Sequence, residues 1–428
     1  MAAPLVSAGR DLVSIGQAAE ILGVTEQTLR NWDRSGKLLA RRHPINGYRF
    51  YHVADLHQLL RRLERGEIDP TVQLPIDFQA EGDDLVVELE ASVDAELALL
   101  PPCHWSPAVA LDPKHRPQDW HRPSSTVRRD WRKYPQEAHV LDARRERYRR
   151  LTVEEIAILQ GFSPSVVEGV SLTDRQRIAG LGDAVPPPLA RAVLEAVNGM
   201  WAWESRTAVE ICAGTGGLAE GAASIGLHHA ALIERSRDCM PMLSNGRAWE
   251  PSRVFIEDVK QHDFRAHGAI GLLSGGPPCQ PWSLSGQRRG QLDERDLLGH
   301  LPELVGELKP EVFLFENVPG LLSESNSAYL DDLIRRLRGP SKSAKYGVMV
   351  GILNAADFGV PQTRRRIFIL GLRDAPSSLA WKCFDAVESL RTHRDPRVPS
   401  DGRDAWITVG DVVSQRIDPG GWRRWIGK

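Results

Sequence analysis

The stretch that most constrains the fold is a turn rich in glycine and proline, residues 275–283, which carries a cysteine. It follows an apolar run, residues 269–273, that predicts a buried strand. Two glycines and two prolines then make a rigid turn, which fixes the direction of the Cys279 thiol. A thiol held in one direction suits a nucleophile. Since a lone cysteine in such a loop is more often structural, the assignment depends on other segments of the chain.

Four segments together resemble the DNA cytosine-5 methyltransferase family. They are Gly-Pro-Pro-Cys-Gln-Pro-Trp-Ser at 276–283, Phe-Glu-Asn-Val at 315–318, Gln-Thr-Arg-Arg-Arg at 362–366 and Ala-Gly-Thr-Gly-Gly at 213–217. Four motifs at family-like spacing are far more specific than any one of them, and the resemblance covers roughly residues 104–420. It implies an α/β fold with the Rossmann-like sheet of S-adenosylmethionine-dependent methyltransferases, S-adenosyl-L-methionine as cofactor and double-stranded DNA as substrate.

Length and composition set outer limits on the protein. A chain of 428 residues favours two or more domains. With no secretory signal and no long apolar run, we expect a cytoplasmic, bacterial or phage-encoded protein associated with the nucleoid and not with a membrane. The five cysteines lie scattered without metal-ligand spacing, which indicates reduced thiols and no metal site. The net charge of -2 does not indicate nucleic-acid binding, so that argument needs local basic patches.

The N-terminal segment, residues 1–75, has the pattern of a small DNA-binding domain. Helical periodicity over 14–22, a turn and a second helix over 25–35 predict a helix-turn-helix. With Gly-Tyr-Arg-Phe-Tyr at 47–51 and a helix over 53–64, it resembles the winged helix-turn-helix of MerR-type regulators. A small helical dimerisation domain is the alternative. The predicted DNA contacts are Gln27, Thr28, Arg30, Asn31 and Arg49.

Charge reverses sign twice along the next segments. Residues 76–103 are acidic and predict a linker that does not touch a phosphate backbone. Residues 104–148 interleave arginines with tryptophans and tyrosines, which suits a nucleic-acid surface more than a solvated charged face. Residues 121–127 resemble the stretch that closes the family's target-recognition region, so the resemblance implies that 104–148 form part of that region, with a remainder expected in 374–428. Three arrangements are open: a region split between both segments, a very small region, or one supplied by a partner chain.

The order of the motifs is unusual. Thr152, with Glu155 three residues later, predicts a capping box that opens a helix. Residues 150–162 and 182–187 resemble family motifs that normally lie near the C-terminus, yet here they precede the cofactor loop. The resemblance therefore implies a circular permutation. Residues 149–200 carry the permuted C-terminal-type motifs, a link over 198–206 joins neighbours in space, and 201–373 form the catalytic and cofactor-binding core.

The cofactor half is predicted over 207–260. A strand over 207–212 leads into a glycine-rich turn, which permits close approach of backbone to a ligand but is weak evidence alone. Glu234 ends the next strand, where a carboxylate can bind ribose hydroxyls, and Asp258 follows the third, where it can accept from the adenine amino group. The family resemblance assigns the same roles, although the family usually has Phe where Cys212 stands. The predicted cofactor-binding residues are Cys212, Ala213, Gly214, Thr215, Gly217, Glu234, Arg235, Asp258, Val259, Pro278, Leu298, Asp183 and Val185.

The resemblance also implies catalytic roles. Cys279 attacks C6 of cytosine, which makes C5 nucleophilic toward the sulfonium methyl. Glu316 hydrogen-bonds N3 and the exocyclic amine, for which it should be protonated or share a proton. Arg366 binds O2, Arg364 orients the loop or reaches phosphate, and Gln362 holds that turn.

The base must leave the helix to reach such a pocket, so base flipping is implied. Residues 283–290 are flexible and basic in character and are predicted to close over DNA. The predicted DNA contacts around this loop are Gln280, Ser285, Arg288 and Arg289.

The first hypothesis is thus a DNA cytosine-5 methyltransferase of a restriction-modification or defence system, with a cognate restriction endonuclease or a second chain as a further partner. The alternative is a helix-turn-helix transcriptional regulator, for which an autoregulatory role is open, and in which the methyltransferase body is secondary. Methylation of tRNA, which some relatives perform, is the third and is disfavoured by the DNA-type N-terminal domain.

Overall fold

The computed structural model describes residues 117–130, 135–245, 247–278, 297–323, 326–416 and 418–424, and in the N-terminal region residues 12–14, 18, 29, 32–33, 38, 41–42, 49–52 and 56. The chain divides into two compact units, Met1–Ala95 and Glu96–Lys428. Within the described residues, no helix has both the length and the apolar character needed to cross a membrane.

The N-terminal unit contains a three-stranded antiparallel sheet of order β1-β3-β2. Its strands are β1 (Leu12–Ser14), β2 (Arg41–Arg42) and β3 (Arg49–His52). Strands β2 and β3 form the hairpin predicted as the wing. The helical, buried residues described in this unit are Ala18, Leu29, Trp32 and Leu56. Outside the described residues lie the predicted contacts Gln27, Thr28, Arg30 and Asn31, and of Arg49 only the backbone is described.

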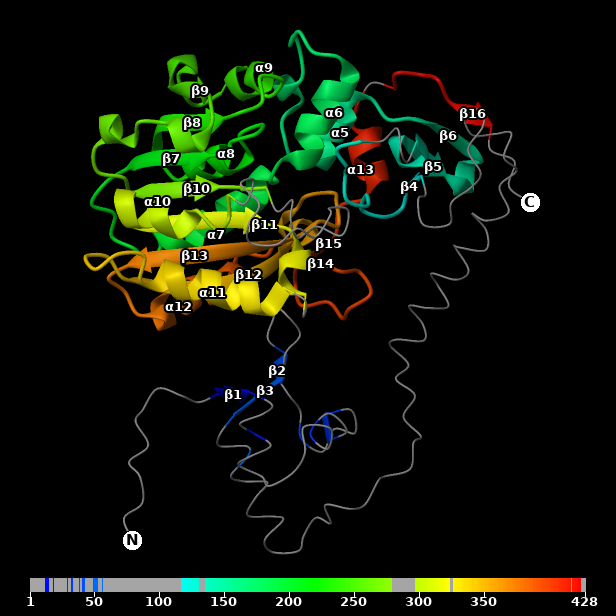
Figure 1. Cartoon of the computed structure of the whole chain (residues 1–428). Helices are drawn as coiled ribbons and strands as arrows, with labels where there is room; N and C mark the ends of the chain where they lie inside the picture. The colour runs from blue at the N-terminus through cyan, green and yellow to red at the C-terminus, as the bar shows by residue number, and fades with distance from the viewer. Residues whose placement is uncertain are drawn as a thin grey trace, which may run out of the picture. The chain divides into compact units, whose positions relative to one another are not determined.

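The second unit is organised around a seven-stranded sheet of order β12-β13-β11-β10-β7-β8-β9 (Figure 1). All its neighbouring strands are parallel except β13, which runs antiparallel to β11 and β12. This mixed, doubly wound sheet confirms the predicted α/β class. The strands are β7 (Thr207–Ile211), β8 (His228–Glu234), β9 (Val254–Ile256), β10 (Leu272–Gly275), β11 (Val312–Asn317), β12 (Tyr346–Asn354) and β13 (Arg365–Arg373).

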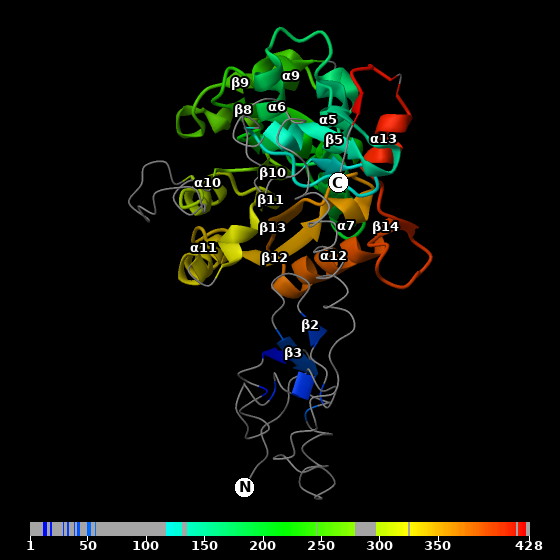
Figure 2. The same cartoon turned by 90° about the vertical axis from the view of Figure 1, so that its right-hand side faces the viewer.

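Helices cover both faces of this sheet. Figure 2 shows α10 and α11 on one side of the stacked strands and α7 on the other. Leu189, Val193 and Val197 recur every four residues along α7, and this stripe joins the apolar cluster that also contains β13 and α12 residues. The helices are α7 (Pro187–Asn198), α8 (Gly217–Ser224), α9 (Met240–Ser244), α10 (Leu301–Leu308), α11 (Ser327–Arg338) and α12 (Ser377–Ser389).

Helix α12 corrects one predicted boundary. The core was expected to end at residue 373, with 374–428 left to the recognition region. Instead Ala380, Phe384 and Val387 are buried in the cluster beneath the sheet, and the Phe384 ring lies where a side chain on Gly351 of β12 would stand. The core therefore extends through α12, because its apolar face needs the sheet to cover it.

A second lobe lies beside the sheet, with its own apolar cluster. Its helices are α5 (Val153–Leu159), α6 (Asp174–Asp183) and α13 (Val409–Ser414). The predicted capping box of Thr152 and Glu155 is present at the start of α5. A small sheet of order β16-β6-β5-β4 completes the lobe, formed by β4 (Gln118–Asp119), β5 (His139–Asp142), β6 (Arg147–Arg150) and β16 (Arg423–Arg424). A separate pair is β14 (His393–Arg394) with β15 (Asp404–Ala405).

Strand ends differ from prediction in ways that affect the site. Strand β7 stops at Ile211, because Cys212 turns into the left-handed region with φ +50°. Strand β10 begins later than predicted and ends at Gly275. Strand β11 runs on to Asn317, so Glu316 lies within it, and β13 begins at Arg365, so Arg366 lies on a strand and not in the preceding loop.

Candidate active site

The predicted site residues gather where the parallel strands end. Strand β7 leads into the glycine loop, β8 ends at Glu234, and β9 is followed by Asp258. Strand β10 leads to Pro278, and β11 carries Glu316 near its end. The carboxyl ends of parallel strands share one edge of a sheet, which is where ligands bind in open α/β folds. The topology therefore brings the cofactor and catalytic motifs to the same edge.

The glycine loop exposes its backbone. Gly214 and Gly216 have φ values of +54° and +80°, which glycine adopts without strain. A Cβ on Gly214 would meet nothing within 4 Å, whereas one on Gly217 would lie 1.8 Å from the Val185 carbonyl oxygen. The loop is thus packed on one side and open on the other, and the open side fits a ligand held against backbone. Thr215 is buried, and no described atom hydrogen-bonds its Oγ1.

Glu234 is fixed by two backbone donors. Its Oε2 accepts the Gly214 N–H at 2.9 Å and its Oε1 accepts the Ser236 N–H at 2.7 Å. Asp258 similarly accepts the Lys260 N–H at 3.0 Å, which caps the turn after β9. Both carboxylates are half-buried at strand ends, where the sequence placed them. Their assignments to ribose and adenine stay predictions.

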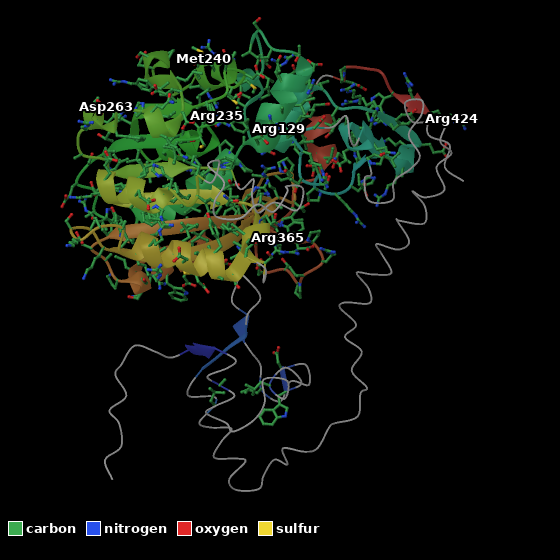
Figure 3. The ribbon with its side chains drawn as sticks, in the orientation of Figure 1. Arg129, Arg235, Met240, Asp263, Arg365 and Arg424 are labelled. Atoms are coloured by element: carbon green, nitrogen blue, oxygen red, sulfur yellow. The ribbon has the colours of Figure 1, made fainter. Side chains whose placement is uncertain are left out.

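The other predicted cofactor residues divide by exposure. Ala213, Val185, Val259 and Leu298 are buried, so they shape the walls of the edge. Arg235, Asp183 and Pro278 are exposed. Asp183 accepts a hydrogen bond from the Arg129 guanidinium at 2.9 Å, and Figure 3 labels Arg129 and Arg235.

The described cysteines are poor nucleophiles. Burial, with the nearby Glu234 carboxylate, raises the pKa of the Cys212 thiol far above its usual value. The same two causes raise the pKa of Cys239 to about 12. Cys383 is buried in the apolar cluster of α12, and burial raises its pKa. A thiol must ionise to attack, so none of the three competes with the predicted nucleophile.

Glu316 and Arg366 form a buried ion pair, 2.8 Å apart from Oε1 to Nε. Burial raises the pKa of Glu316 above its usual value, and Arg366 and Arg364 oppose the shift. A carboxyl group in these surroundings takes up a proton more readily than one in water. That Glu316 is protonated or shares a proton during the reaction stays a prediction.

Side chains alternate along the start of β13. Arg364 is buried and Arg366 is half-buried, whereas Arg365 between them, labelled in Figure 3, is exposed. Arg364 is 1% exposed and donates to the carbonyl oxygens of Val127, Gly182 and Ala184 at 3.2, 2.9 and 2.9 Å. Of its two predicted roles, these contacts favour orienting the loop, because a guanidinium so enclosed does not reach a phosphate.

Gln362 is fully buried and holds its turn through both ends of its amide. Its Oε1 accepts the Val127 N–H at 3.0 Å, and its Nε2 donates to the Leu159 carbonyl at 2.9 Å. Backbone bonds from Ser124 to Pro361 and from Thr363 to Ser124 tie the same turn to the segment before Val127.

Asn317 is a site residue that the sequence reasoning did not single out. Its Nδ2 donates to the Pro277 carbonyl at 3.0 Å, so β11 anchors the turn two residues before the predicted nucleophile. The quoted Glu-Asn-Val motif was the available signal, but the sequence does not show which loop the amide reaches. Outside the described residues lie Cys279, Gln280, Ser285, Arg288 and Arg289.

Arg247 is a second residue that was missed. It is buried, donates to Glu220 and to the Thr215 carbonyl of the glycine loop, and lies over the rings of Phe162 and Trp249. It therefore supports the loop from below. No motif marked it, because its partners come from distant segments.

The fold and the arrangement of this edge are those of the S-adenosylmethionine-dependent methyltransferase class. The family model for C-5 cytosine-specific DNA methylase matches residues 105–199 and 207–419, and the chain belongs to this family. A second family model, MerR family regulatory protein, matches residues 14–51.

Two relatives and one solved structure are similar to parts of this chain. The chain is 36% identical over 171 residues to the type II methyltransferase M.NgoMIV of Neisseria gonorrhoeae, covering 39% of this chain and 52% of that one. It is 33% identical over 180 residues to the type II methyltransferase M.AquIA of Picosynechococcus, and the match covers 39% of this chain and 71% of that protein. The solved S. pombe Dnmt2 methyltransferase is 22% identical, with a TM-score of 0.31, and covers 39% of this chain and 50% of its own.

Proposed function

We propose that this protein transfers a methyl group to C5 of a cytosine flipped out of duplex DNA. The observation that carries the proposal is the buried Glu316–Arg366 pair, at the edge of the sheet that also holds the glycine loop and the start of the Pro-Cys turn. A buried acid beside a guanidinium presents complementary groups to the N3 and O2 edge of a pyrimidine. The matched family model, C-5 cytosine-specific DNA methylase, supports DNA as the substrate.

The nucleophile in this proposal is Cys279. Its thiolate adds to C6 of the base, forming a carbon–sulfur bond and raising electron density at C5. Bound S-adenosylmethionine supplies the electrophilic methyl group. Once C5 carries that methyl, loss of the C5 proton to a base expels the thiolate and restores the aromatic ring. Asn317, through the Pro277 carbonyl, fixes the base of the turn from which Cys279 is presented.

Glu316 acts as the group that meets developing charge on the ring. In its protonated form it donates to N3 while its other oxygen accepts from the exocyclic amine. Arg366 holds the carboxyl in place and donates to O2. Arg364, two residues before Arg366, holds the start of β13 in place by donating to three backbone carbonyls.

The chain's own residues suit the cofactor that its family implies. The open face of Gly214 allows close approach of a ligand, Glu234 at the end of β8 would hold the ribose hydroxyls, and Asp258 would accept from the adenine amino group. The Val185 carbonyl closes the side at Gly217. These placements also support the circular permutation, because the permuted segment packs directly against the loop that follows β7.

The recognition region, in our proposal, is assembled from two distant segments. Strand β16 pairs with β6, and Trp422 packs against Trp120, at 5.9 Å between ring centroids, and against Arg147, whose guanidinium is 4.0 Å from the Trp422 ring. This supports the split arrangement among the three that the sequence left open. The exposed basic side chains of this small sheet and its turns are Arg144, Arg145, Arg150, Arg423 and Arg424.

A salt titration of DNA affinity tests this surface. Replacing Arg423 and Arg424 by alanine should lower the slope of log affinity against log salt by about 2, one for each lost phosphate contact. Arg265→Ala is the matched control, since this arginine is exposed beside Asp263, at the opposite end of the unit from Arg424 in Figure 3. An unchanged slope in the double variant, or an equal change in the control, would refute the surface.

The N-terminal unit supports a second role. The match to the MerR family model and the β2–β3 hairpin favour DNA contact by this unit, through its second helix and wing. We propose that it binds duplex DNA in addition to the methyltransferase, which leaves room for autoregulation within a restriction-modification or defence system. Binding of residues 1–95 to DNA upstream of its own coding region tests that role.

The direct test of the activity uses the purified full chain with methyl-labelled S-adenosylmethionine. Unmethylated plasmid DNA and tRNA are offered separately, and labelled nucleosides are identified after digestion. We expect 5-methylcytosine from the DNA and no label in the tRNA. Label only in tRNA would contradict the proposal and support the third hypothesis.

A further inference from the structure

A closed ring of buried hydrogen bonds joins the residues just before β13, which we call the base-binding strand, to the segment 182–185 beside the glycine loop. The Val127 N–H donates to Gln362 Oε1, and Gln362 Nε2 donates to Gln160 Oε1 at 2.7 Å. Gln160 Nε2 then donates to the Ala184 carbonyl at 2.7 Å. Arg364 closes the ring by donating to both Ala184 and Val127. Gln160, Gln362 and Arg364 are all at most 1% exposed.

The two ends of this ring lie next to different parts of the site. On one side, Arg364 is two residues from Arg366, which pairs with Glu316. On the other, Ala184 lies between Asp183 and Val185, and the Val185 carbonyl packs on Gly217 of the glycine loop. Gln160, at the end of α5, uses its acceptor toward the first side and its donor toward the second.

We propose that Gln160 is a positioning residue for the transfer reaction, setting the base-binding strand and the cofactor loop relative to each other. The proposal rests on the proposed function for its kinetic half only. Methyl transfer needs the two reacting centres aligned, and a small misplacement of either is costly. An amide is suited to this task because its oxygen accepts and its nitrogen donates, so that it can link two partners through separate atoms.

The fold is expected to survive loss of this side chain. Arg364 still bonds Gly182, Ala184 and Val127, and Gln362 keeps its bond to the Leu159 carbonyl. What is lost is the side-chain link between the two amides, which leaves one buried N–H of Gln362 without a partner. The structure therefore predicts a folded variant with altered alignment.

The test uses the full chain with Gln160→Leu, which keeps the size but removes both bonds. Calorimetry gives the Kd of S-adenosylhomocysteine without DNA, and label transfer to unmethylated plasmid DNA gives kcat at saturating cofactor. After correction for the folded fraction, we expect the Kd to rise about threefold to tenfold and kcat to fall about tenfold. Both values within twofold of wild type would overturn the proposal.

Val167→Ala is the matched control. Val167 is fully buried in the apolar cluster that also contains Val127 and Ala184, but neither its backbone nor its side chain takes part in the ring. Removal of its two methyl groups should lower the free energy of unfolding about as much as Gln160→Leu does, and should leave both the Kd of S-adenosylhomocysteine and kcat within about twofold of wild type. If this control lost as much, Gln160 would be only structural. Wild type that binds S-adenosylhomocysteine without methylating DNA would refute the proposed function, while the Kd comparison would still decide the cofactor half.

Gln160→Glu adds a pH readout that a packing role would not move. The introduced carboxyl, when neutral, has the shape of the amide and restores the donor toward the Ala184 carbonyl. When ionised it presents only acceptors. The ratio of variant to wild-type kcat should therefore rise as pH is lowered from about 8 to about 6, while the Gln160→Leu ratio stays flat. A flat ratio for both variants would contradict the proposal.

Discussion

The proposed active site lies along one edge of the seven-stranded sheet, and the base end and the cofactor end of this edge differ in burial and charge. At the base end, Glu316 on β11 and the residues Gln362 and Arg364 just before β13 are buried, and their partners are fixed side chains and backbone groups. At the cofactor end, on β7 and β8, the working surface is glycine backbone at positive φ beside the half-buried carboxylate Glu234. One end is enclosed and charged, and the other is open and mostly backbone.

This difference follows from what each end must do. Charge develops on a base during the reaction, and a preorganised, water-excluding site stabilises it most effectively. In the same proposal no charge develops on the ribose and adenine of the cofactor, so an open edge of backbone and hydrogen-bonding carboxylates is enough to hold it. Substitutions at the base end should therefore change kcat, and those at the cofactor end should change binding.

Cys279→Ala is expected to give the largest difference between the effect on catalysis and the effect on cofactor binding. Loss of the thiol removes the C6 adduct, so methyl transfer should be abolished. The Kd of S-adenosylhomocysteine should stay within about twofold, because the cofactor groups come from other strands. Label transfer and calorimetry on one preparation measure both. Transfer that survives this change would refute covalent catalysis.

Glu316→Ala sharpens the comparison next. It removes the acid that meets the ring nitrogen, so kcat should fall about 100-fold to 1,000-fold. Arg366 loses its ion-pair partner, and thermal melting identifies any loss of the folded form. Cofactor affinity should be unchanged in the folded protein. A large loss of cofactor affinity would mean that the two ends are not separable.

The pH dependence of transfer tests the protonation of Glu316. Because burial raises the pKa of this acid, its neutral form persists to higher pH than in a solvated glutamate. Transfer that needs the neutral acid is full below that raised pKa and falls as pH rises through it, by up to about tenfold per pH unit. Glu316→Gln should lack this decline. An equal decline in both proteins would assign it to another group.

At the cofactor end, Glu234→Ala should raise the Kd of S-adenosylhomocysteine about tenfold or more, since charge-assisted hydrogen bonds and the hold on Gly214 are lost together. At saturating cofactor, kcat should change little. Asp263→Ala is the matched control, because this carboxylate is exposed and caps a turn elsewhere. Equal effects from both carboxylates would show a non-specific charge effect.

The smallest effect is expected from removal of residues 1–75. The described core clusters of the methyltransferase lie in the second unit, so transfer at saturating DNA should be retained. DNA affinity should weaken about threefold to tenfold through loss of a second binding module. Unfolding of the remaining chain, measured by thermal melting, would place the domain boundary elsewhere.

Much of this site could be predicted because it follows from strand ends. Glu234, Asp258 and Glu316 each come at the end of an apolar run, and parallel strands bring such positions to one edge. The capping box at Thr152 is a local pattern that needs no tertiary context, and it is present. Local signals of this kind are visible in a single sequence.

The missed features depend on distant contacts. Gln362 and Gln160 are 202 residues apart, and Asn317 reaches a carbonyl 40 residues before it, so no local period marks them. Helix α12 was missed although Ala380, Cys383, Phe384 and Val387 recur at helical spacing, because this stripe indicates a helix but not the surface of β12 that covers it. These contacts are fixed by topology, and topology is the step that a single sequence specifies least directly.

The most direct measurement is bisulfite sequencing of plasmid DNA from cells that express the full chain alone, beside the Cys279→Ala variant. The account predicts protected cytosines in one repeated sequence context with the wild-type chain and none with the variant, which would establish the activity and its target together. No protection from soluble, folded wild-type protein would contradict it, and would favour the helix-turn-helix unit as the working part of the protein.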